Sequence, residues 1–369
     1  MDSVDGYIFN EPLVLLAEDG GNFGDPDRPI AYAIEGKTWV NNHAHVLRAR
    51  DGIVSTPFLH RVLSFYDVRA FLSGTTRAKL IKSDATGIPV AIPAPSEQRR
   101  IVEILDQADA IRKKRAEADK LAERILPALF YDMFGDPATN PRGWPNMTLG
   151  STAQVMSDGP FGSNLKTAHY VPEGVRVVRL QNIGVGEFLD DNRAYVSEEH
   201  FATIAKHRCE PGDVLIGTLG DPNIRACLLP DTIRFALNKA DCVQLRPDRR
   251  VARAEYITWL LNLPETLRLA AGLVRGETRQ RISMGRLRDM VVPVPPIRLQ
   301  HRFAEAARTV ARAKQQQTSA GARNELLFAA LTHRAFSGEL TAKWREKNKA
   351  LIEKEMVEQK KILNTTKEE

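Results

Sequence analysis

Length, composition and charge limit the classes of protein to which this chain can belong. It has 369 residues, 43% of them hydrophobic, which is enough for two modest domains with ordinary cores. No apolar run is long enough to span a membrane, no signal-peptide pattern opens the sequence, and the three cysteines have neither a disulfide nor a zinc spacing, so the cytoplasm is the expected compartment. The net charge of +6 is compatible with a polyanionic partner but does not require one.

The first region, residues 1–96, has the pattern of a mixed α/β domain. Short apolar runs alternate with turn formers, and one longer segment has helical periodicity. This region is therefore interpreted as the first globular domain. In chain order, the pattern predicts a strand at 13–17, turns at 18–26, a hairpin of 30–34 and 38–40 across 35–37, a helix within 58–71 and a strand across 75–92.

A long amphipathic helix is predicted next, over residues 97–136. Its apolar residues recur at alternating steps of three and four, the spacing of a heptad seam, with one polar break at Arg115. Pro127 lies inside the pattern and is expected to bend or break the helix. The seam residues are Ile101, Ile104, Ala108, Ile111, Arg115, Ala118, Ala122, Ile125 and Leu129.

The second half of the chain repeats this order. A turn-rich linker leads into a second α/β domain, residues 137–296, which is followed by a second long helix, residues 297–338. The charged tail, residues 339–369, has weak helical periodicity and is expected to be a solvated or frayed helix. Adding 202 to each position of the first seam places the second seam at Phe303, Ala306, Val310, Ala313, Gln317, Ala320, Asn324, Leu327 and Leu331.

The junction between a proline-rich strand end and a long helix occurs twice. Residues 92–101 read IPAPSEQRRI and residues 294–303 read VPPIRLQHRF, and the match continues without gaps at an offset of 202 for about forty residues. Such a match indicates a duplicated unit. The repeated seams predict two helices that pair as an antiparallel coiled coil about a pseudo-two-fold axis, with Arg115 facing Gln317. The alternative is that each helix packs only on its own domain.

The globular regions repeat as well. The Gly-Asp-Pro sequence at 24–26 recurs at 220–222, an offset of 196, and Gly74 corresponds to Gly276 at an offset of 202. An offset of 196 leaves no room in the first domain for a counterpart of roughly 144–195, so that domain is expected to begin partway through the fold. The predicted fold class is two α/β (mixed α+β) domains in tandem, alternating with two long helices.

No combination of residues predicts catalysis or a metal site. His43 and His45 share one strand face, but their repeat counterparts at the predicted offset are Lys239 and Asp241, which cannot supply the same ligands. The carboxylates and lysine within 27–37 mimic a metal-dependent nuclease, yet the repeat lacks the lysine, so we interpret this pattern as coincidence. The glycine-rich turns lack a phosphate-loop sequence, and no methyltransferase cofactor loop is found. No cofactor is therefore expected.

Polar and basic residues on predicted loops suggest a ligand when they are taken together. They lie in the loop at 157–166, the strand at 179–182 and the basic loop at 275–283, which is echoed at 75–79. Arg and Lys contact phosphate or guanine, and Asn and Gln can pair with adenine, so the set predicts DNA contacts on one face of the second domain. The candidates are Ser163, Asn164, Lys166, Arg179, Gln181, Asn182, Thr218, Arg225, Asn238, Arg275, Thr278, Arg279 and Arg281, with Arg77 and Lys79 in the first domain.

These motifs together resemble the specificity (S) subunit of a type I restriction-modification system. The resemblance covers the chain to about residue 345 and rests on Pro-x-Pro followed by Gln-x-Arg-Ile/Phe at each junction, with Gly-Pro-Phe-Gly-Ser at 159–163, Leu-Gln-Asn-Ile at 180–183 and Gly-x-Thr-Arg at 276–279. In that family each globular domain reads one half of a split sequence in double-stranded DNA. The paired helices act as a spacer and bind two modification (methyltransferase) subunits, and restriction subunits complete the full complex.

The resemblance implies a DNA-recognition subunit that is not itself an enzyme. The first domain lacks the Gly-Pro-Phe-Gly-Ser and Leu-Gln-Asn-Ile elements, which leaves a second hypothesis: a partial subunit that binds the modification subunit without reading a full bipartite site. A self-contained nuclease or methylase is the least favoured, because no cofactor loop is found. The predicted coiled-coil and partner contacts are Ile101, Ile104, Ile111, Arg115, Ile125, Leu129, Phe303, Val310, Gln317, Leu327 and Leu331.

Overall fold

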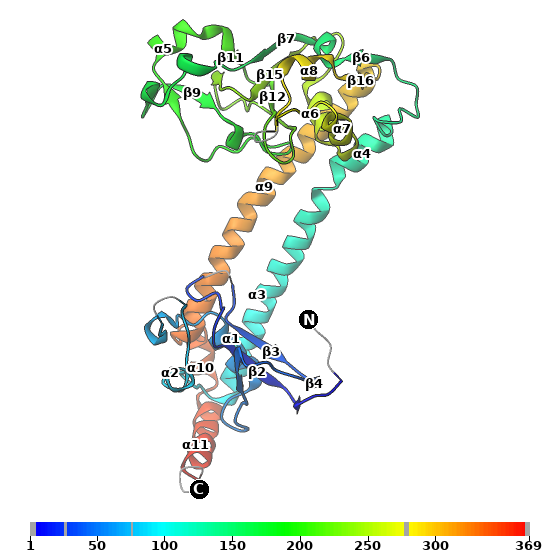
Figure 1. The fold of residues 1–369 in the computed structure, drawn as a ribbon. Helices are drawn as coiled ribbons and strands as arrows, with labels where there is room; N and C mark the ends of the chain where they lie inside the picture. Colours follow the sequence, from blue (N-terminus) through cyan, green and yellow to red (C-terminus); the bar gives the residue numbers. More distant parts are fainter. Residues whose placement is uncertain (1–4, 26–27, 75–76, 277–279, 366–369) are drawn as a thin grey trace. The chain divides into compact units, whose positions relative to one another are not determined.

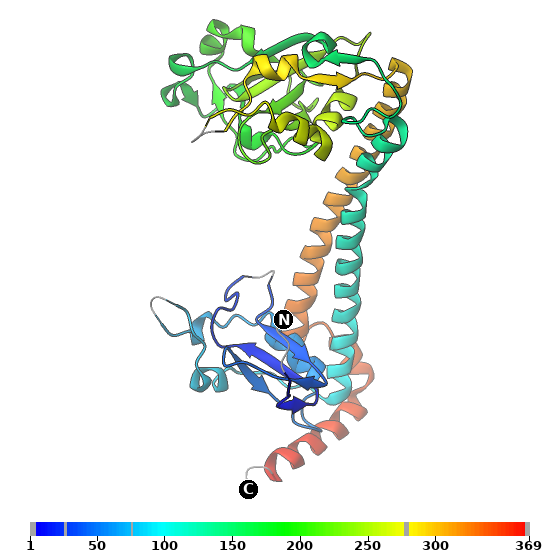
Figure 2. The ribbon, with the colours of Figure 1, turned by 45° about the vertical axis from the view of Figure 1, so that its right-hand side comes forward.

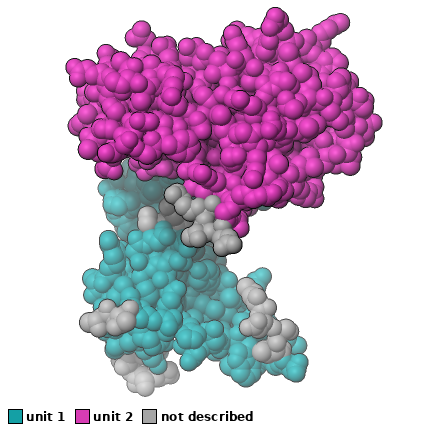
Figure 3. Space-filling model, turned by 45° about the horizontal axis from the view of Figure 1, so that its top comes forward, with its two compact units in different colours: residues 1–117, 318–369 teal, residues 118–317 magenta. Residues whose placement is uncertain are grey.

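The structure is a computed structural model that describes residues 5–25, 28–74, 77–276 and 280–365. The chain divides into two compact units (Figure 3): unit 1 comprises residues 1–117 and 318–369, and unit 2 comprises residues 118–317. Both boundaries fall within long helices, α3 (Pro95–Ala122) and α9 (Ile297–Phe336). In the part of the chain that the structure describes, no helix is long and apolar enough to cross a membrane.

Unit 1 is built on a three-stranded antiparallel sheet with β2 at its centre (Figure 1). Helix α1 (Thr56–Ser64) packs on β2 and β3. It starts where the sequence signals a start, because the Ser55 hydroxyl accepts the Phe58 N–H and Pro57 lies in the first turn. The other elements are β2 (Leu13–Ala17), β3 (Ala31–Ile34), β5 (Ala44–Leu47), a small ribbon of β1 (Phe9–Asn10) with β4 (Lys37–Thr38), and the 3-10 turn η1 (Arg69–Phe71).

The predicted hairpin across residues 35–37 is wrong. β3 pairs with β2 and not with β4, and the pairing of β1 with β4 continues the same antiparallel register. The ladder is interrupted between the two pairs because Pro12 has no N–H to donate and Gly36 has a left-handed φ of 74°. The chain therefore continues in one direction through Gly36 and does not reverse there.

The strand predicted across residues 75–92 is also wrong. Of the described part, which excludes residues 75–76, only Lys79 takes part in a β-bridge. The chain then forms the short helix α2 (Lys82–Thr86) and an irregular segment, in which Pro89 cannot donate to a ladder. The helix predicted within 58–71 is found in a shorter form, as α1 followed by η1.

The two long helices pair antiparallel within unit 1 (Figures 1 and 2). Near the start of α3, Leu105 clusters with Ala335 at the end of α9. Farther along α3, the Arg112 guanidinium lies over the ring of Phe328, 4.5 Å from its centroid, and donates to Glu325 at 3.0 Å. Residue numbers rise along one helix while they fall along the other, as the predicted antiparallel arrangement requires.

The predicted seam is right only in part. Ile101 and Phe303 are buried, whereas Ile111, Ile125 and Leu327 are 57%, 49% and 56% exposed. On α9 the neighbour of Leu327, Phe328, takes the inward position in its place. Of the other seam residues Ala313 is exposed and the rest are partly buried, among them Ile104, Leu129, Val310 and Leu331. Arg115 and Gln317 are also partly buried; their contact would join the two units and stays a prediction.

A break between α3 and α4 (Ile125–Phe134) explains why the seam fails at Ile125. In a continuous helix the ring of Pro127 would clash with the carbonyl of Glu123, four residues earlier. Pro127 lies instead in the first turn of α4, where its missing N–H breaks no helical bond, so the predicted break is found. The break interrupts the heptad register, and α4 turns Leu126 and Phe130 inward.

Unit 2 contains two main sheets with helices packed against them. One is antiparallel, in the order β13-β12-β15-β7; the other is mixed, in the order β11-β14-β9-β10-β8, with β14 parallel to β9. This arrangement confirms the predicted α/β class. The strands are β6 (Asn146–Thr148), β7 (Ala153–Asp158), β8 (Tyr170–Val171), β9 (Val175–Val178), β10 (Tyr195–Val196), β11 (Arg208–Cys209), β12 (Val214–Gly217), β13 (Arg225–Leu228), β14 (Ala236–Asn238), β15 (Cys242–Pro247) and β16 (Val291–Pro293). The helices are α5 (Glu198–Thr203), α6 (Ala254–Asn262), α7 (Pro264–Ala271) and α8 (Met284–Asp289).

Four aromatic side chains fill the centre of unit 2. Phe130 and Phe134 of α4, Tyr256 of α6 and Phe303 of α9 pack with ring centroids 4.9–5.6 Å apart. The Tyr256 hydroxyl donates to the carbonyl of Pro293 at 2.7 Å, and burial raises the pKa of Tyr256. This cluster joins the end of α4 to the start of α9.

The start of α3 is held by a buried glutamine. The Gln98 Nε2 donates to the carbonyls of Ile53 and Pro93, at 2.7 and 2.9 Å. Its Oε1 accepts the N–H of Ser55 at 2.9 Å. One side chain therefore joins the long helix, the end of the preceding segment and the start of α1.

Gln300 does the same at the start of α9 in unit 2. Its Nε2 donates to the carbonyls of Val251 and Pro295, at 3.1 and 2.8 Å, and its Oε1 accepts the N–H of Arg253 at 2.9 Å. The two junctions thus make the same three hydrogen bonds, as the duplicated sequence predicts.

The strands of the two units also correspond, although the offset of 196 predicted for them is wrong. The Glu18 N–H donates to the carbonyl of His43, and the Thr218 N–H donates to the carbonyl of Asp241, both at 3.0 Å. These equivalent bonds give offsets of 200 and 198, because the loops between the paired strands differ in length. Among the described residues, the five-stranded sheet has no counterpart in unit 1.

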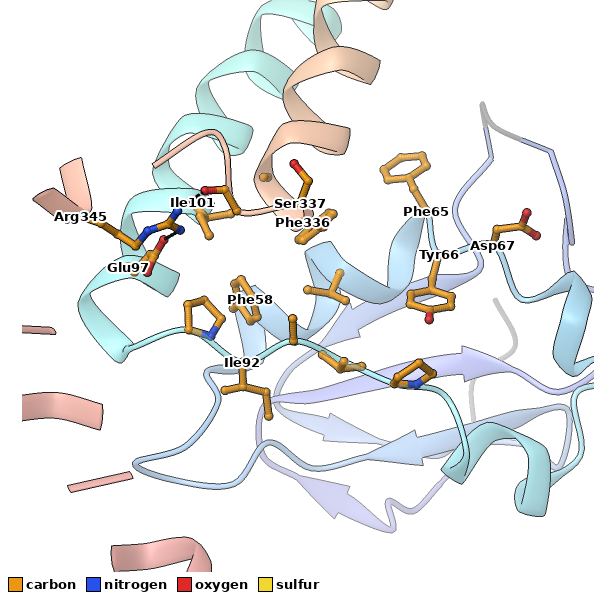
Figure 4. Close-up of a pocket in the computed structure, with 17 residues that line it drawn as sticks. Phe58, Phe65, Tyr66, Asp67, Ile92, Glu97, Ile101, Phe336, Ser337 and Arg345 are labelled. Carbon is orange, nitrogen blue, oxygen red and sulfur yellow. Dashed lines mark hydrogen bonds and ion pairs between the residues drawn. The ribbon is translucent and has the colours of Figure 1, made fainter. Parts of the chain in front are cut away.

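The described part of the tail is helical and mostly solvated, as predicted, but it is not frayed, because it is an ordered part of unit 1. It forms α10 (Ala342–Lys347) and α11 (Lys349–Thr365). Arg345 pairs with Glu97 at 2.7 Å beside a pocket of about 610 Å³ (Figure 4), and Ile352 of α11 is buried. These few inward-facing residues lie among many solvated charged residues, so the helical periodicity of the tail is weak in the sequence.

Candidate nucleic-acid interface

Several loops of unit 2 meet at Thr218, the residue that follows β12. Its N–H and its hydroxyl both donate to the carbonyl of Asp241, at 3.0 and 3.1 Å. Its carbonyl accepts the N–H of Ile282 at 3.0 Å. The side chain is 2% exposed. Thr218 therefore ties the turn at 239–241 and the end of the basic loop to one strand end.

Asn238 and Gly159 attach a further loop at the same place. The Asn238 amide donates to the carbonyls of Ser157 and Cys242, at 3.3 and 3.2 Å, and the residue is fully buried. Gly159 approaches Lys239 so closely that an added Cβ would lie 2.1 Å from its carbonyl carbon, so this position requires glycine. The loop that begins at Gly159 therefore starts against the turn at 239–241.

Arg225 brings in the turn at 180–183. Its guanidinium donates to the carbonyls of Ile183, Leu180 and Leu219, at 2.7, 3.2 and 3.4 Å. Within the same turn the buried Asn182 amide donates to the carbonyls of Leu189 and Asp191. We call the loops joined in this way, residues 159–166, 180–183, 219–223, 239–241, 275–276 and 280–281, the loop cluster.

Four of the predicted DNA contacts are wrong for one reason. Asn182, Thr218 and Asn238 are buried, and the guanidinium of Arg225 is occupied by backbone carbonyls. Their polar groups compensate backbone groups that would otherwise be buried without a partner. These four side chains hold the loop cluster together and do not themselves face a ligand.

The other candidates in unit 2 lie on the surface or at its edge. Arg281 is 54% exposed, with Nη1 3.5 Å from Asp241, and Arg275 is exposed while donating to the carbonyl of Val274. Arg179 is partly buried and donates to the side chain of Asn192 at 2.8 Å. Four further candidates on the loop cluster are exposed: Ser163, Asn164, Lys166 and Gln181. Thr278 and Arg279 lie outside the described residues.

Sequence reasoning missed Lys239, which belongs to this cluster. Its ammonium lies 5.7 Å from the ring centroid of Tyr170, just beyond the loop that carries Lys166. Its sequence signal was weak, since a single lysine after an apolar strand is common on protein surfaces. The cluster therefore gathers cations from at least three loops that are far apart in sequence, a distribution suited to a polyanion.

The equivalent loop of unit 1 carries cations that are already paired. The Arg77 guanidinium lies 3.0 Å from Asp19 Oδ1, and the Lys79 ammonium lies 3.4 Å from Glu18 Oε1. The Asp19 side chain is only 8% exposed and also contacts His43 Nδ1 at 2.9 Å. Arg77 and Lys79 are thus placed as predicted, on the loop that corresponds to the basic loop of unit 2, but beside carboxylates that offset their charge.

Two other kinds of site were considered in the described residues, a metal centre and a reactive thiol. They contain no group of three or more His, Cys, Asp or Glu side chains that could hold a metal ion. The cysteines Cys209, Cys227 and Cys242 are buried, and burial raises the pKa of Cys227 and of Cys242 to about 12. Thiols in this state are poor nucleophiles at neutral pH.

Comparisons with known proteins show what the chain is similar to. Residues 1–121 match the family described as type I restriction modification DNA specificity domain. A putative type I restriction enzyme specificity subunit of Haemophilus influenzae, S.HindORF215P, is 26% identical over 315 residues, which cover 82% of this chain and 75% of that protein. The EcoDI specificity subunit of Escherichia coli is 23% identical over 398 residues, covering 95% and 83%.

Solved structures share the fold. A chain from a structure of a type I restriction-modification system aligns with a TM-score of 0.56 at 19% identity, covering 92% of this chain and 85% of that one. The S subunit of a type I system from M. genitalium aligns with a TM-score of 0.53 at 14% identity, covering 90% and 85%. The family model and the two relatives are all described as DNA or restriction-enzyme specificity proteins.

Over most of its length the chain is similar to type I restriction-modification specificity subunits, as its motifs predict.

Proposed function

We propose that unit 2 reads one half of a DNA target through the loop cluster. The observation that carries this proposal is the convergence of loops from five parts of the chain, held by Thr218, Asn238 and Arg225, together with exposed cations on these loops. Lys166 and Arg281 are placed to neutralise phosphates, and Asn164 and Gln181 offer amides to base edges. Residues that hold the loops from below would keep these groups in register on the duplex.

We further propose that the long helices dock two modification subunits, with restriction subunits completing the complex. Large apolar side chains are exposed on these helices and at the start of α4. Leu326 and Leu327 of α9 are 72% and 56% exposed in unit 1, and Leu121 of α3 and Ile125 of α4 are 64% and 49% exposed in unit 2. Exposed apolar residues grouped on a helix are typical of protein–protein contacts. In this proposal the partner subunits perform methyl transfer and DNA cleavage, and the chain itself catalyses neither.

A second candidate function is a subunit that reads only half of a bipartite target. The observation that favours it is the pairing of Arg77 and Lys79 with Asp19 and Glu18 in unit 1. A loop whose cations are offset in this way would contribute little to phosphate binding. Unit 2 would then supply most of the DNA affinity and all of the specificity.

Methylome sequencing of a strain that expresses the chain with its cognate modification subunit tests both candidates. Methylated adenine in both halves of a split motif would establish that both units read DNA. Methylation at a single half-motif or at its palindrome would assign reading to unit 2 alone. A complex that assembles but methylates no defined site would overturn the proposal for unit 2.

A further inference from the structure

Helix α11 closes the start of α3 with a carboxylate. The Glu355 Oε2 accepts both the N–H and the hydroxyl of Ser96, at 3.0 and 2.7 Å. The Arg99 guanidinium lies 4.0 Å from the other carboxylate oxygen. The first N–H groups of a helix have no partner inside the helix and attract negative charge, so Glu355 satisfies both needs.

One turn later, α11 places Gln359 on the junction. Its Nε2 lies 2.8 Å from the carbonyl of Ile53 and 3.2 Å from that of Pro93, the two carbonyls to which Gln98 also donates. A carbonyl has two lone pairs, so each can accept from both amides. Gln359 is 6% exposed. Glu355 and Gln359 are four residues apart and therefore lie on one face of α11.

Unit 2 has the same pair of carbonyls at the start of its long helix, which we call the receptor, but no second side chain of the described residues binds there. Gln300 donates to the carbonyls of Val251 and Pro295, and no second amide from the described residues reaches either one. The residues at the start of the long helix are also more exposed in unit 2 than in unit 1. Ala94 and Ser96 are 1% and 7% exposed in unit 1, whereas the corresponding residues of unit 2, Pro296 and Arg298, are exposed.

The receptor of unit 2 differs from that of unit 1 in the position of its charge and in space. Arg298 replaces Ser96 and exposed His301 replaces Arg99, so the full positive charge that a carboxylate would meet lies at position 298 and not at the position of Arg99. Gly52 leaves room for Ile362 of α11, whose Cδ1 lies 2.6 Å from the position of an added Cβ. The residue of unit 2 that corresponds to Gly52 is Arg250, whose side chain is 89% exposed and pairs with Asp248 at 2.7 Å.

We propose that the start of α9 in unit 2 is a receptor for a helix of a partner subunit. That helix carries a glutamine for the carbonyls of Val251 and Pro295, and a carboxylate four residues earlier for Arg298. Three residues after the glutamine, where α11 has an isoleucine, it carries a small or acidic residue that tolerates Arg250. The helix α11 in unit 1 is the template for this chemistry, and the site lies at the start of α9, apart from the exposed apolar residues of the helices.

A labelled peptide of residues 349–365 with Ile362→Ala is a suitable probe, because it keeps Glu355 and Gln359 and removes the side chain that would meet Arg250. Its binding to the intact chain is measured by fluorescence anisotropy. We expect saturable binding with one peptide per chain. Arg298→Glu in the protein should weaken binding about tenfold, and Gln359→Ala in the peptide should weaken it by a similar factor.

A charge exchange distinguishes the receptor from a non-specific basic patch. A peptide with Glu355→Lys should bind the wild-type chain poorly and should recover most of the affinity on the Arg298→Glu chain. Lys206→Glu makes the same change of charge at an exposed residue on another element of unit 2, and it should leave peptide binding unchanged.

Three results would overturn the proposal. The first is the absence of saturable binding to the intact chain, and the second is binding that Arg298→Glu and Gln359→Ala leave unchanged. The third is a stable dimer of the chain that Gln359→Ala dissociates, which would assign the receptor to α11 of a second copy. None of these results bears on methylation specificity, so the proposal and the DNA-reading function can fail separately.

Discussion

Units 1 and 2 share a scaffold and differ in the side chains that the scaffold presents. In both, the basic loop is tied to the end of the central strand by one backbone bond, Leu80 N–H to the carbonyl of Glu18 at 2.8 Å and Ile282 N–H to the carbonyl of Thr218 at 3.0 Å. Glu18 adds a carboxylate beside Lys79, whereas Thr218 adds an uncharged hydroxyl. Duplication therefore retained the backbone bonds that define the fold, while the carboxylates beside the loop differ: Lys79 lies beside both Glu18 and Asp19, and Arg281 lies 3.5 Å from Asp241.

The cores of the two units also share equivalent contacts and differ in the size of the side chains that make them. The Phe134–Tyr256 contact of unit 2 corresponds to Phe336–Phe58 in unit 1, with ring centroids 5.0 and 6.3 Å apart. Phe303, however, corresponds to the smaller Ile101. The pocket of about 610 Å³ in unit 1 is lined by these smaller residues (Figure 4). The equivalent contacts tolerate a loss of volume in one copy because the glutamine junction still joins the elements.

The largest expected effect is on the stability of the two cores. Phe303→Ala should lower the free energy of unfolding of unit 2 by about 3–5 kcal/mol, since it removes the centre of a packed aromatic cluster. Ile101→Ala in unit 1 should lower it by about 2 kcal/mol, because that side chain already borders a cavity. Urea unfolding followed by circular dichroism measures both. Equal losses would show that the two cores are packed alike.

Removing cations from the loop cluster should weaken DNA binding next most strongly. Lys166→Ala combined with Arg281→Ala is expected to reduce affinity for target DNA about 10- to 100-fold and to lower the slope of log affinity against log salt by about two. Anisotropy titrations at several salt concentrations measure both quantities. Arg142→Ala, an exposed arginine in the linker, is the matched control. A double variant with the affinity and slope of this control would remove the loop cluster from the interface.

A change in unit 1 should sharpen the comparison in the opposite direction. Asp19→Asn keeps the shape of the side chain and removes the charge beside Arg77 and Lys79, so DNA affinity should rise about five- to tenfold with a steeper salt slope. Glu11→Gln makes the same change of net charge at the carboxylate that pairs with Arg48, and it should have no such effect. Equal increases in both variants would indicate a general effect of net charge.

Filling the pocket of unit 1 should make its core more like that of unit 2. Ala335 lines the pocket and corresponds to Met133, so Ala335→Met is expected to raise the free energy of unfolding by about 1 kcal/mol. The reverse change, Met133→Ala, should lower it in unit 2. Thermal unfolding of both variants measures this, and a destabilised Ala335→Met chain would mean that the pocket cannot accept the larger side chain.

The smallest expected effect depends on pH and concerns His60 of α1. Burial is the largest cause that lowers the pKa of His60 from its ordinary value of 6.5, so the unfolded chain binds this proton more tightly than folded unit 1. The contribution of His60 to the free energy of unfolding is present in full above pH 6.5 and is lost as the pH falls through the lowered pKa. His60→Gln should flatten the fall in unfolding free energy between about pH 6.5 and 5. An unchanged profile would assign the acid sensitivity to other groups.

The junctions show what could be predicted from the sequence and why. Gln98 lies five residues after Pro93, to whose carbonyl it donates, and the repeat preserves this spacing at Gln300 and Pro295. A contact between residues so close in sequence leaves a short pattern, and its exact repetition without gaps made the duplication and the family recognisable. The heptad seam was predicted less well, because Pro127 forces a break before Ile125 and, on the unbroken helix α9, Phe328 lies inward in place of Leu327.

The sequence by itself therefore determined the duplicated plan of two α/β domains and two long helices. Only the tertiary structure decided which polar residues face outward. Thr218 donates to Asp241, 23 positions away, Arg225 to Ile183, 42 away, and Gln359 to Ile53, 306 away. A polar side chain reads the same in sequence whether it meets water or a buried carbonyl, because the partner that satisfies it is brought close only by the fold.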